Sequence, residues 1–252
     1  MNPPDLFAVL LLALLGFSLG TGITMVILLK RRGHWQPLPM TPPSGAFEER
    51  PFSVSNHGNA FVVRPTSWLA IKSRNLAAVQ ASLGLHNAKS CSWVEGLACN
   101  DKLFIAPPVR SWILVFGSGL PDPADDVDQC FRFLATLSRR LGQVQFFSAS
   151  RILHHHSWVR MEKGRVIRAY AWSGRTQWQQ GPNTAAELEL GLKCLPYGDW
   201  LERSSFGLPD GVVSNVDKVP LLAARWSLDP AGIEEQFLAR ERGIAGEPSR
   251  RF

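Results

Sequence analysis

The chain has 252 residues, of which 45% are hydrophobic and 19% are charged, and its formal net charge is +6. These proportions are typical of a globular protein and exclude a chain that is disordered throughout. No single stretch carries the basic stripe that a nucleic-acid-binding element needs, so the composition does not favour nucleic acid as a partner. Beside a membrane, attraction to anionic lipid headgroups is the simpler explanation of the charge.

The first predicted element is a membrane-spanning helix. A short flank of residues 1–5 precedes an uninterrupted, uncharged apolar run from Leu6 to Leu29. A helix of that length extends roughly 36 Å, enough to cross a hydrocarbon core of about 30 Å. A cleaved signal peptide would have a basic flank and a shorter apolar core, and this chain has neither. We therefore expect an uncleaved, single-pass anchor in the lipid bilayer.

The residues beside and within the apolar run predict its orientation and its pairing. Lys30, Arg31 and Arg32 follow it directly, which favours an inner-membrane protein whose C-terminal domain lies in the cytoplasm. The inverted orientation stays open, because large domains can cross a membrane whatever their flanking charge. Gly16 and Gly20 permit a helix-mediated homodimer, although glycine is also common in membrane helices generally.

Three further regions follow the anchor. Residues 30–64 are predicted to be a linker that is first basic and then rich in proline, because this stretch shows no sustained hydrophobic period. Residues 65–240 are predicted to form one globular domain, and residues 241–252 a basic tail. The linker would hold the domain off the bilayer as a separate module.

The first half of the domain is expected to combine one helix with short strands. The pattern predicts a helix that starts at Thr66 or Ser67, runs to Leu83 and ends at Gly84. Three strands are expected after it, over Trp93–Leu97, Leu103–Ala106 and Ser111–Phe116. The last of these is strongly apolar and long enough to be central.

The middle of the domain carries the clearest helix and a hairpin. Asp122 is the expected N-cap of a helix that Gly142 ends, with Val127, Cys130, Phe131, Leu134, Leu137 and Leu141 along its apolar stripe. Gln143–Ser148 is predicted to be a strand. Lys163-Gly164 is predicted to join two further strands in a β-hairpin. A three-residue loop there would bury one face, made by Val159, Met161, Ile167 and Ala169.

The C-terminal part is expected to be helical. Thr184 and Glu187 form a capping box that starts one helix. Val219–Trp226 is predicted to be a short helix, and Asp229-Pro230 to start another that runs to Phe237. The order of elements favours a single α+β domain with a mainly antiparallel sheet, and with mixed pairing around Ser111–Phe116.

Several landmarks of the chain are shared with other proteins. They are "SWVEGL", "LFIAPPVRSWILVFG", "LSRRLGQVQFFSASR", "WVR…GRVIRAYAW" and "WSLDP". On these landmarks, Trp68 to Pro230 resembles uncharacterised bacterial domains. The resemblance implies a single domain, and it implies no activity, because none is assigned to such domains.

The cysteines predict neither a metal site nor a redox motif. Cys91, Cys99, Cys130 and Cys194 include no C-x-x-C pair. In a reducing cytoplasm they are expected to be buried thiols. If the domain were exported instead, Cys91 and Cys99 would be the pair expected to form a disulfide.

Three consecutive histidines are the most conspicuous polar cluster. Successive side chains of a strand point to opposite faces, so only His154 and His156 could share a metal ion. A catalytic site needs about three protein ligands, and no spacing in the sequence supplies the third. The alternative is an exposed loop before the hairpin. No cofactor is predicted.

A glycine-rich turn and one face of the hairpin are the other candidate sites. Gly117-Ser118-Gly119 lies between a strand and a helix, as a phosphate-binding turn does, but the aspartates after it would repel an anion. Five residues could share one face of the hairpin and contact a ligand or partner: Trp158, Arg160, Arg168, Tyr170 and Trp172. The alternatives are a solvated face, or one that is packed under a helix.

The sequence is therefore consistent with two functions. The first is a membrane-anchored protein-interaction or regulatory module, with the hairpin face contacting a protein partner. The second is a membrane-tethered, hydrolase-like enzyme, with or without the assistance of a metal, whose site is assembled from dispersed residues. A pocket that gathers His154, His156 and carboxylates such as Glu187 or Asp199 would favour the enzyme.

Overall fold

The computed structural model describes residues 52–55, 62–99, 101–198 and 210–248. The chain divides into two compact units, Met1–Glu48 and Glu49–Phe252, and every described residue belongs to the second. The predicted membrane segment, the Gly16 and Gly20 pair and most of the linker lie outside the described residues. None of the helices within the described ranges is long and apolar enough to cross a membrane.

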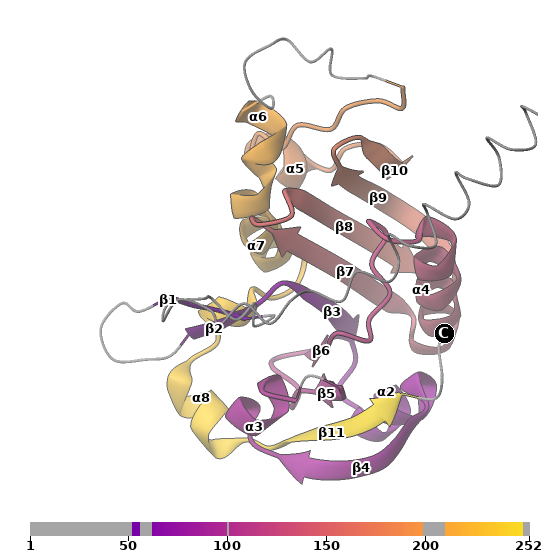
Figure 1. The fold of residues 1–252 in the computed structure, drawn as a ribbon. Helices are drawn as coiled ribbons and strands as arrows, with labels where there is room; N and C mark the ends of the chain where they lie inside the picture. Colours follow the sequence, from indigo (N-terminus) through magenta and orange to yellow (C-terminus); the bar gives the residue numbers. More distant parts are fainter. Residues whose placement is uncertain (1–51, 56–61, 100, 199–209, 249–252) are drawn as a thin grey trace, which may run out of the picture. The chain divides into compact units, whose positions relative to one another are not determined.

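A nine-stranded sheet forms the centre of the described unit (Figure 1). Its strand order is β10-β9-β8-β7-β3-β6-β5-β11-β4, and every neighbouring pair is antiparallel. The strands are β3 (Ser67–Lys72), β4 (Leu85–Cys91), β5 (Leu103–Ile105), β6 (Trp112–Phe116), β7 (Gln143–Ser150), β8 (His155–Glu162), β9 (Arg165–Ser173), β10 (Thr176–Gln180) and β11 (Gly243–Pro248). β1 (Phe52–Ser55) and β2 (Val62–Pro65) pair separately with each other.

The predicted α+β class with an antiparallel sheet is confirmed, but the mixed pairing is wrong. β6, which covers the strand expected at Ser111–Phe116, is antiparallel to both of its neighbours, β3 and β5. It does lie in the interior of the sheet, as its apolar sequence indicated.

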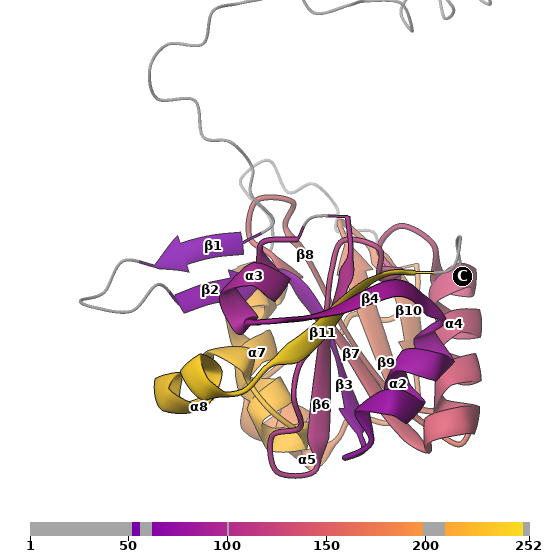
Figure 2. The ribbon, with the colours of Figure 1, turned by 90° about the horizontal axis from the view of Figure 1, so that it is seen from below.

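Helices cover both faces of this sheet, as Figure 2 shows from below. The helices α2 (Leu76–Leu83) and α4 (Val127–Leu141) pack on one face. The opposite face carries α3 (Trp93–Leu97), α5 (Ala185–Glu189), α6 (Asp210–Val213), α7 (Asn215–Trp226), the 3₁₀ turn η1 (Pro230–Gly232) and α8 (Glu235–Arg240). The sheet is therefore the middle of three layers, with a hydrophobic core on each side.

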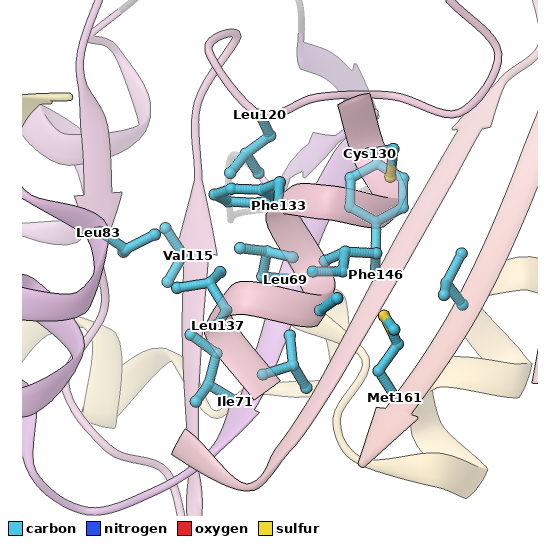
Figure 3. Packing of buried hydrophobic residues seen from close by; sticks show 14 of the residues in the cluster. Leu69, Ile71, Leu83, Val115, Leu120, Cys130, Phe133, Leu137, Phe146 and Met161 are labelled. Atoms are coloured by element: carbon cyan, nitrogen blue, oxygen red, sulfur yellow. The ribbon is translucent and has the colours of Figure 1, made fainter. Parts of the chain in front are cut away.

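The core under α2 and α4 joins residues from distant parts of the chain (Figure 3). Leu69 from β3, Val115 from β6 and Phe146 from β7 meet Leu83 from α2 and Leu137 from α4, and all five are almost wholly buried. At about 1.5–3 kcal/mol for each buried side chain of this size, this core is a major source of stability.

The helix expected from residue 66 or 67 to Leu83 is wrong in its first half. Ser67–Lys72 is the strand β3, and the helix starts only at Leu76, with Asn75 as its N-cap. Trp68 and Leu69 face the two opposite cores, so β3 is apolar on both sides and shows no alternation. A continuous apolar run of this kind does not distinguish a buried strand from a helix. Gly84 ends α2 in the left-handed conformation, as expected.

The strand expected at Trp93–Leu97 is a helix, α3. Ser92 and Glu95 form a capping box at its start, with Ser92 N–H donating to the Glu95 carboxylate at 2.7 Å. The S-x-x-E spacing is a local helix signal that is visible in the sequence. Trp93 packs into the core from this helix, whereas the neighbouring Val94 is exposed.

Helix α4 is confirmed, although it begins four residues later than its expected first position. Asp126 is the N-cap and accepts from Gln129 N–H, whereas Asp122 closes the preceding turn by accepting from Ala124 N–H. Phe131 was expected in the buried stripe, but it is 40% exposed.

The hairpin is confirmed, with a tighter turn than expected. Glu162 pairs with Arg165, so the loop has two residues, and both have positive φ angles: 48° at Lys163 and 81° at Gly164. These angles are those of a type I′ turn, which matches the twist of the strands. A register shift after Arg160 then turns Ile167 outward, where it is 40% exposed, and the expected burial of Ile167 is wrong.

The C-terminal region differs from its expected form in two places. The helix expected from Asp229 to Phe237 is divided into η1 and α8. The stretch expected to be a basic tail supplies β11, which lies between β5 and β4 and extends the sheet to Pro248. Gly243 and Gly246 occur in this strand, and glycine conceals a strand from propensity-based assignment.

Candidate functional site

The aromatic and basic side chains of the β8–β9 hairpin do share one face, but that face is packed under helices. Four of the five predicted contact residues expose no surface: Trp158, Arg168, Tyr170 and Trp172. The fifth, Arg160, is half-buried and forms an ion pair with Glu162 at 2.7 Å. The hairpin face therefore belongs to the core, and four of its five predicted contact residues have no exposed surface with which to touch a partner.

Arg168 is held by acceptors in every direction. Its Nε donates to the two carboxylate oxygens of Glu187 at 2.8 and 3.1 Å, and both side chains are fully buried. The other guanidinium nitrogens donate to the carbonyl oxygens of Ala169, Gln180 and Gly181, to Asn183 Oδ1 and to Cys194 Sγ. Because its donors are occupied, Arg168 ties the segment after β10 to the sheet and has none left to bind a substrate.

Glu187 performs two structural tasks at once. It completes the predicted capping box, accepting from Thr184 N–H at 2.7 Å. It also accepts from Trp158 Nε1 at 2.7 Å and from Arg168. The capping spacing located Glu187 on a helix, but nothing local in the sequence showed that α5 would turn this carboxylate toward β8 and β9.

His156 is fixed in one neutral tautomer. Lys193 N–H donates to Asn215 Oδ1 at 3.1 Å, and Asn215 Nδ2 donates to Lys193 O at 2.7 Å, so the orientation of the amide is set by the backbone. The Asn215 NH₂ group also faces His156 Nε2 at 3.2 Å. Nε2 must then accept, and the imidazole proton lies on Nδ1.

The surroundings of His156 oppose its protonation. The ring is stacked between Trp158 and Trp172, with centroid distances of 5.6 and 5.5 Å. Burial, with a smaller contribution from neighbouring His155, lowers the pKa of His156 to about 3. A neutral imidazole whose acceptor nitrogen is already bonded serves the packing of the core.

The two histidines of the predicted metal site are separated by burial. His154 lies exposed in the turn before β8, with a φ angle of 49°, whereas His156 is wholly buried. Within the described ranges, no three His, Cys, Asp or Glu residues are placed to hold a metal ion. The structure therefore places His154 and His156 in different environments and does not bring them together as two ligands of one site. Glu187 is in the core, and Asp199 lies outside the described residues.

A serine, a histidine and an aspartate meet near the start of α4, a grouping that the sequence did not reveal. His155 Nε2 lies 3.2 Å from Ser148 Oγ and 3.8 Å from Asp122 Oδ2. A nucleophilic relay needs the serine and the carboxylate on different ring nitrogens, and here both face Nε2. Ser148 is also only 1% exposed. The geometry suits a structural role, in which His155 links β7 to the turn before α4.

The glycine-rich turn is explained by its backbone. Gly117 has a φ angle of 142°, and a side chain there would meet Lys102 O at 2.5 Å. Leu120 N–H closes the turn by donating to Gly117 O. The helix that follows starts at Val127, with Asp126 as its N-cap, and not directly after the glycines, so the turn is not placed to present a phosphate to the helix N-terminus.

Comparison with known proteins adds no family. No protein-family model, curated protein or solved structure matches the chain. The resemblance drawn from the sequence landmarks therefore assigns neither a family nor a function.

Proposed function

We propose that this chain is a single-pass, membrane-anchored interaction module that presents the turn between β7 and β8 to a protein partner. The observation that carries the proposal is the exposure of two consecutive large aliphatic residues at this turn. Ile152 is 72% exposed and Leu153 is 66% exposed. Single exposed apolar residues are ordinary, but an adjacent pair on a projecting turn provides an anchor of the kind that protein interfaces bury.

The turn is held in place at both ends. Leu153 N–H donates to Ser150 Oγ at 3.2 Å, and Arg151 Nε donates to Asp217 Oδ1 at 2.7 Å, which ties the turn to α7. His154 completes it in a left-handed conformation. A pre-organised loop loses little conformational entropy on binding, so more of the contact energy appears as affinity.

The free energy available from burying Ile152 and Leu153 fits a reversible contact. Full burial of each aliphatic side chain contributes about 1.5–3 kcal/mol, so Ile152 and Leu153 together contribute about 3–6 kcal/mol. That amount alone corresponds to weak binding, which the membrane anchor can supplement by raising the local concentration of both partners.

The membrane location and its sidedness form part of the same proposal. The apolar run from Leu6 to Leu29 and the basic residues directly after it support an inner-membrane anchor with the domain in the cytoplasm. A reporter fused after Arg32 tests this. Reporter activity confined to the exported compartment would overturn the proposed orientation.

The partner contact is tested by cross-linking and co-purification from gently solubilised membranes. The paired variant Ile152→Asp with Leu153→Asp is compared with Val94→Asp, because Val94 is 76% exposed on α3, far along the sheet from the turn. We expect one set of cross-linked partners to disappear in the turn variant and to remain with Val94→Asp. Identical cross-linked species in both variants would contradict the proposal.

A further inference from the structure

Basic side chains from separate elements gather at one end of the nine-stranded sheet. We call this cluster the basic end; its exposed residues are Lys72, Arg74, Arg110, Arg139, Arg140, Lys163 and Arg165. They belong to the end of β3, the turn before β6, the last turn of α4 and the β8–β9 turn.

Strand register places two of these residues, Lys72 and Arg165, in one row across the end of the sheet. Ile71 pairs with Val144, so the next residues along, Lys72 and Gln143, lie at the same level of the sheet. Gln143 pairs with Glu162, and Glu162 with Arg165. One row therefore crosses β3, β7, β8 and β9 at their ends, and at about 4.8 Å between strands it is roughly 14 Å wide.

The β8–β9 turn is docked against the end of α4. Gly164 N–H donates to Ser138 Oγ at 2.9 Å, and Lys163 N–H donates to Gly142 O at 2.8 Å. The stem of Arg139 packs so closely on this turn that a side chain at Gly164 would meet Arg139 Cγ at 2.6 Å. The arginines of α4 and the cations of the hairpin are thus held on one surface.

Within the described part of the domain, the cations of the basic end have no acidic partners. None of the seven forms an ion pair with a described acidic residue. Glu162 is the acidic residue of the row, and it is already paired with Arg160. A dense group of unpaired cations favours contact with an extended anionic surface.

We propose that the basic end docks on the anionic lipid headgroups of the membrane that holds the N-terminal segment. This inference rests on the proposed membrane anchor. Each basic residue near such a surface contributes an attraction of about 1 kcal/mol, and tethering raises the local concentration of lipid. Nucleic acid is the weaker candidate, because the charges come from strand ends and turns and not from one element that could enter a groove.

Docking in this way gives the domain a defined orientation. β7 and β8 have eight residues each, and the basic end and the Ile152–Leu153 turn lie at their opposite ends. At about 3.3 Å per residue, the turn would point away from the bilayer at a distance of roughly 26 Å. Contact of one end with lipid would thus leave the other end free for a partner.

The test uses the full chain with a protease site introduced in the linker. The protein is reconstituted into vesicles of phosphatidylcholine alone and into vesicles of an equal mixture of phosphatidylcholine and phosphatidylglycerol. After cleavage, sedimentation shows whether the released domain stays with the lipid. The variant Lys72→Gln with Arg140→Gln is compared with Lys89→Gln and Arg175→Gln, which remove the same charge from exposed positions outside the basic end.

We expect the released domain to remain on the anionic vesicles at low salt, to leave them at high salt, and to leave the neutral vesicles at once. The Lys72 and Arg140 variant should bind about 30-fold more weakly, and the control variant should bind like the parent. An anchored chain whose domain leaves both vesicle types, or equal losses in the two variants, would overturn the basic-end contact alone. An intact chain that sediments with neither vesicle type would overturn the anchor as well. Removal of the domain from anionic vesicles by an RNA or DNA oligonucleotide at equal charge concentration would assign the surface to nucleic acid.

Discussion

Arg168 Nε lies 2.8 Å from Glu187 Oε1, and neither side chain exposes any surface to solvent. Removing two charges from water costs several kcal/mol for each, and this cost is recovered only where geometry is good and the remaining hydrogen bonds are satisfied. Both conditions hold here, because Thr184 and Trp158 also donate to the carboxylate. The ion pair fixes the position at which α5 packs on the sheet.

Breaking this ion pair from one side should be severe. Glu187→Gln leaves the Arg168 charge buried without a counter-charge, and we expect the free energy of unfolding to fall by about 3–5 kcal/mol. Denaturant unfolding of the full chain in detergent, followed by tryptophan fluorescence, measures the change. Glu189→Gln is the control. Glu189 lies on the exposed side of the same helix, α5, and pairs with Arg225 of α7. This substitution should change the free energy of unfolding by no more than about 1 kcal/mol. Equal losses in the two variants would contradict the assignment.

The buried imidazole of His156 predicts a loss of stability in acid. Its pKa in the folded state is about 3, below the ordinary value of 6.5, so only the unfolded chain takes up this proton between those values. Stability from this residue is therefore complete above pH 6.5 and is lost as the pH falls toward 3, by at most about 4–5 kcal/mol.

The measurement for His156 compares unfolding free energies across that pH range. His156→Gln can keep an acceptor for Asn215 and does not titrate, so its stability should fall less steeply with acid than that of the parent. His154→Gln is the control, since His154 is exposed in a turn and its replacement should leave the slope unchanged. A slope in His156→Gln as steep as that of the parent would refute the prediction.

Gly181 is predicted to tolerate no side chain. Its φ angle is 78°, a Cβ at this position would lie 2.3 Å from Ile167 O, and its own carbonyl accepts from Arg168. Gly181→Ala should therefore destabilise the domain by several kcal/mol. Gly174→Ala is matched to it, because Gly174 has a φ angle of 72° but open space around it, and should cost about 1 kcal/mol. Both substitutions place alanine at a positive φ angle, so the difference between their thermal midpoints measures the effect of the steric clash with the backbone of Ile167.

The thiols should differ in reactivity. Burial raises the pKa of Cys194 to about 12, and it raises the pKa of the fully buried Cys130 well above its usual range. Native protein at neutral pH should therefore label with a maleimide much more slowly at these two positions than at Cys99, which is partly exposed. Mass spectrometry identifies the labelled residues, and all four cysteines should react in denaturant. Rapid labelling of Cys194 in the folded protein would show that its surroundings open readily.

The features that were predicted correctly depend on residues close together in the sequence. The capping box of Thr184 and Glu187, the glycine stop of α4 and the Lys163-Gly164 turn all arise within a few residues. The errors arise where contacts with distant segments determine the local structure. β3 was mistaken for a helix because both of its faces are buried, and β11 was mistaken for a tail because its stability comes from pairing with β4 and β5.

For the candidate sites, alternation along the hairpin showed which side chains share a face but not whether that face meets solvent. Trp158, Tyr170 and Trp172 lie together as expected, and the segment after β10 and α7 cover them. The sequence by itself determined an α+β domain, its best helices and its hairpin, because capping, turn geometry and periodicity are local. Only the tertiary structure decided that Arg168 is internal, that Ile152 and Leu153 project, and that Lys72, Arg139 and Arg165 form one charged end. Burial and surface charge depend on which distant segments pack together, and local sequence patterns do not predict that packing.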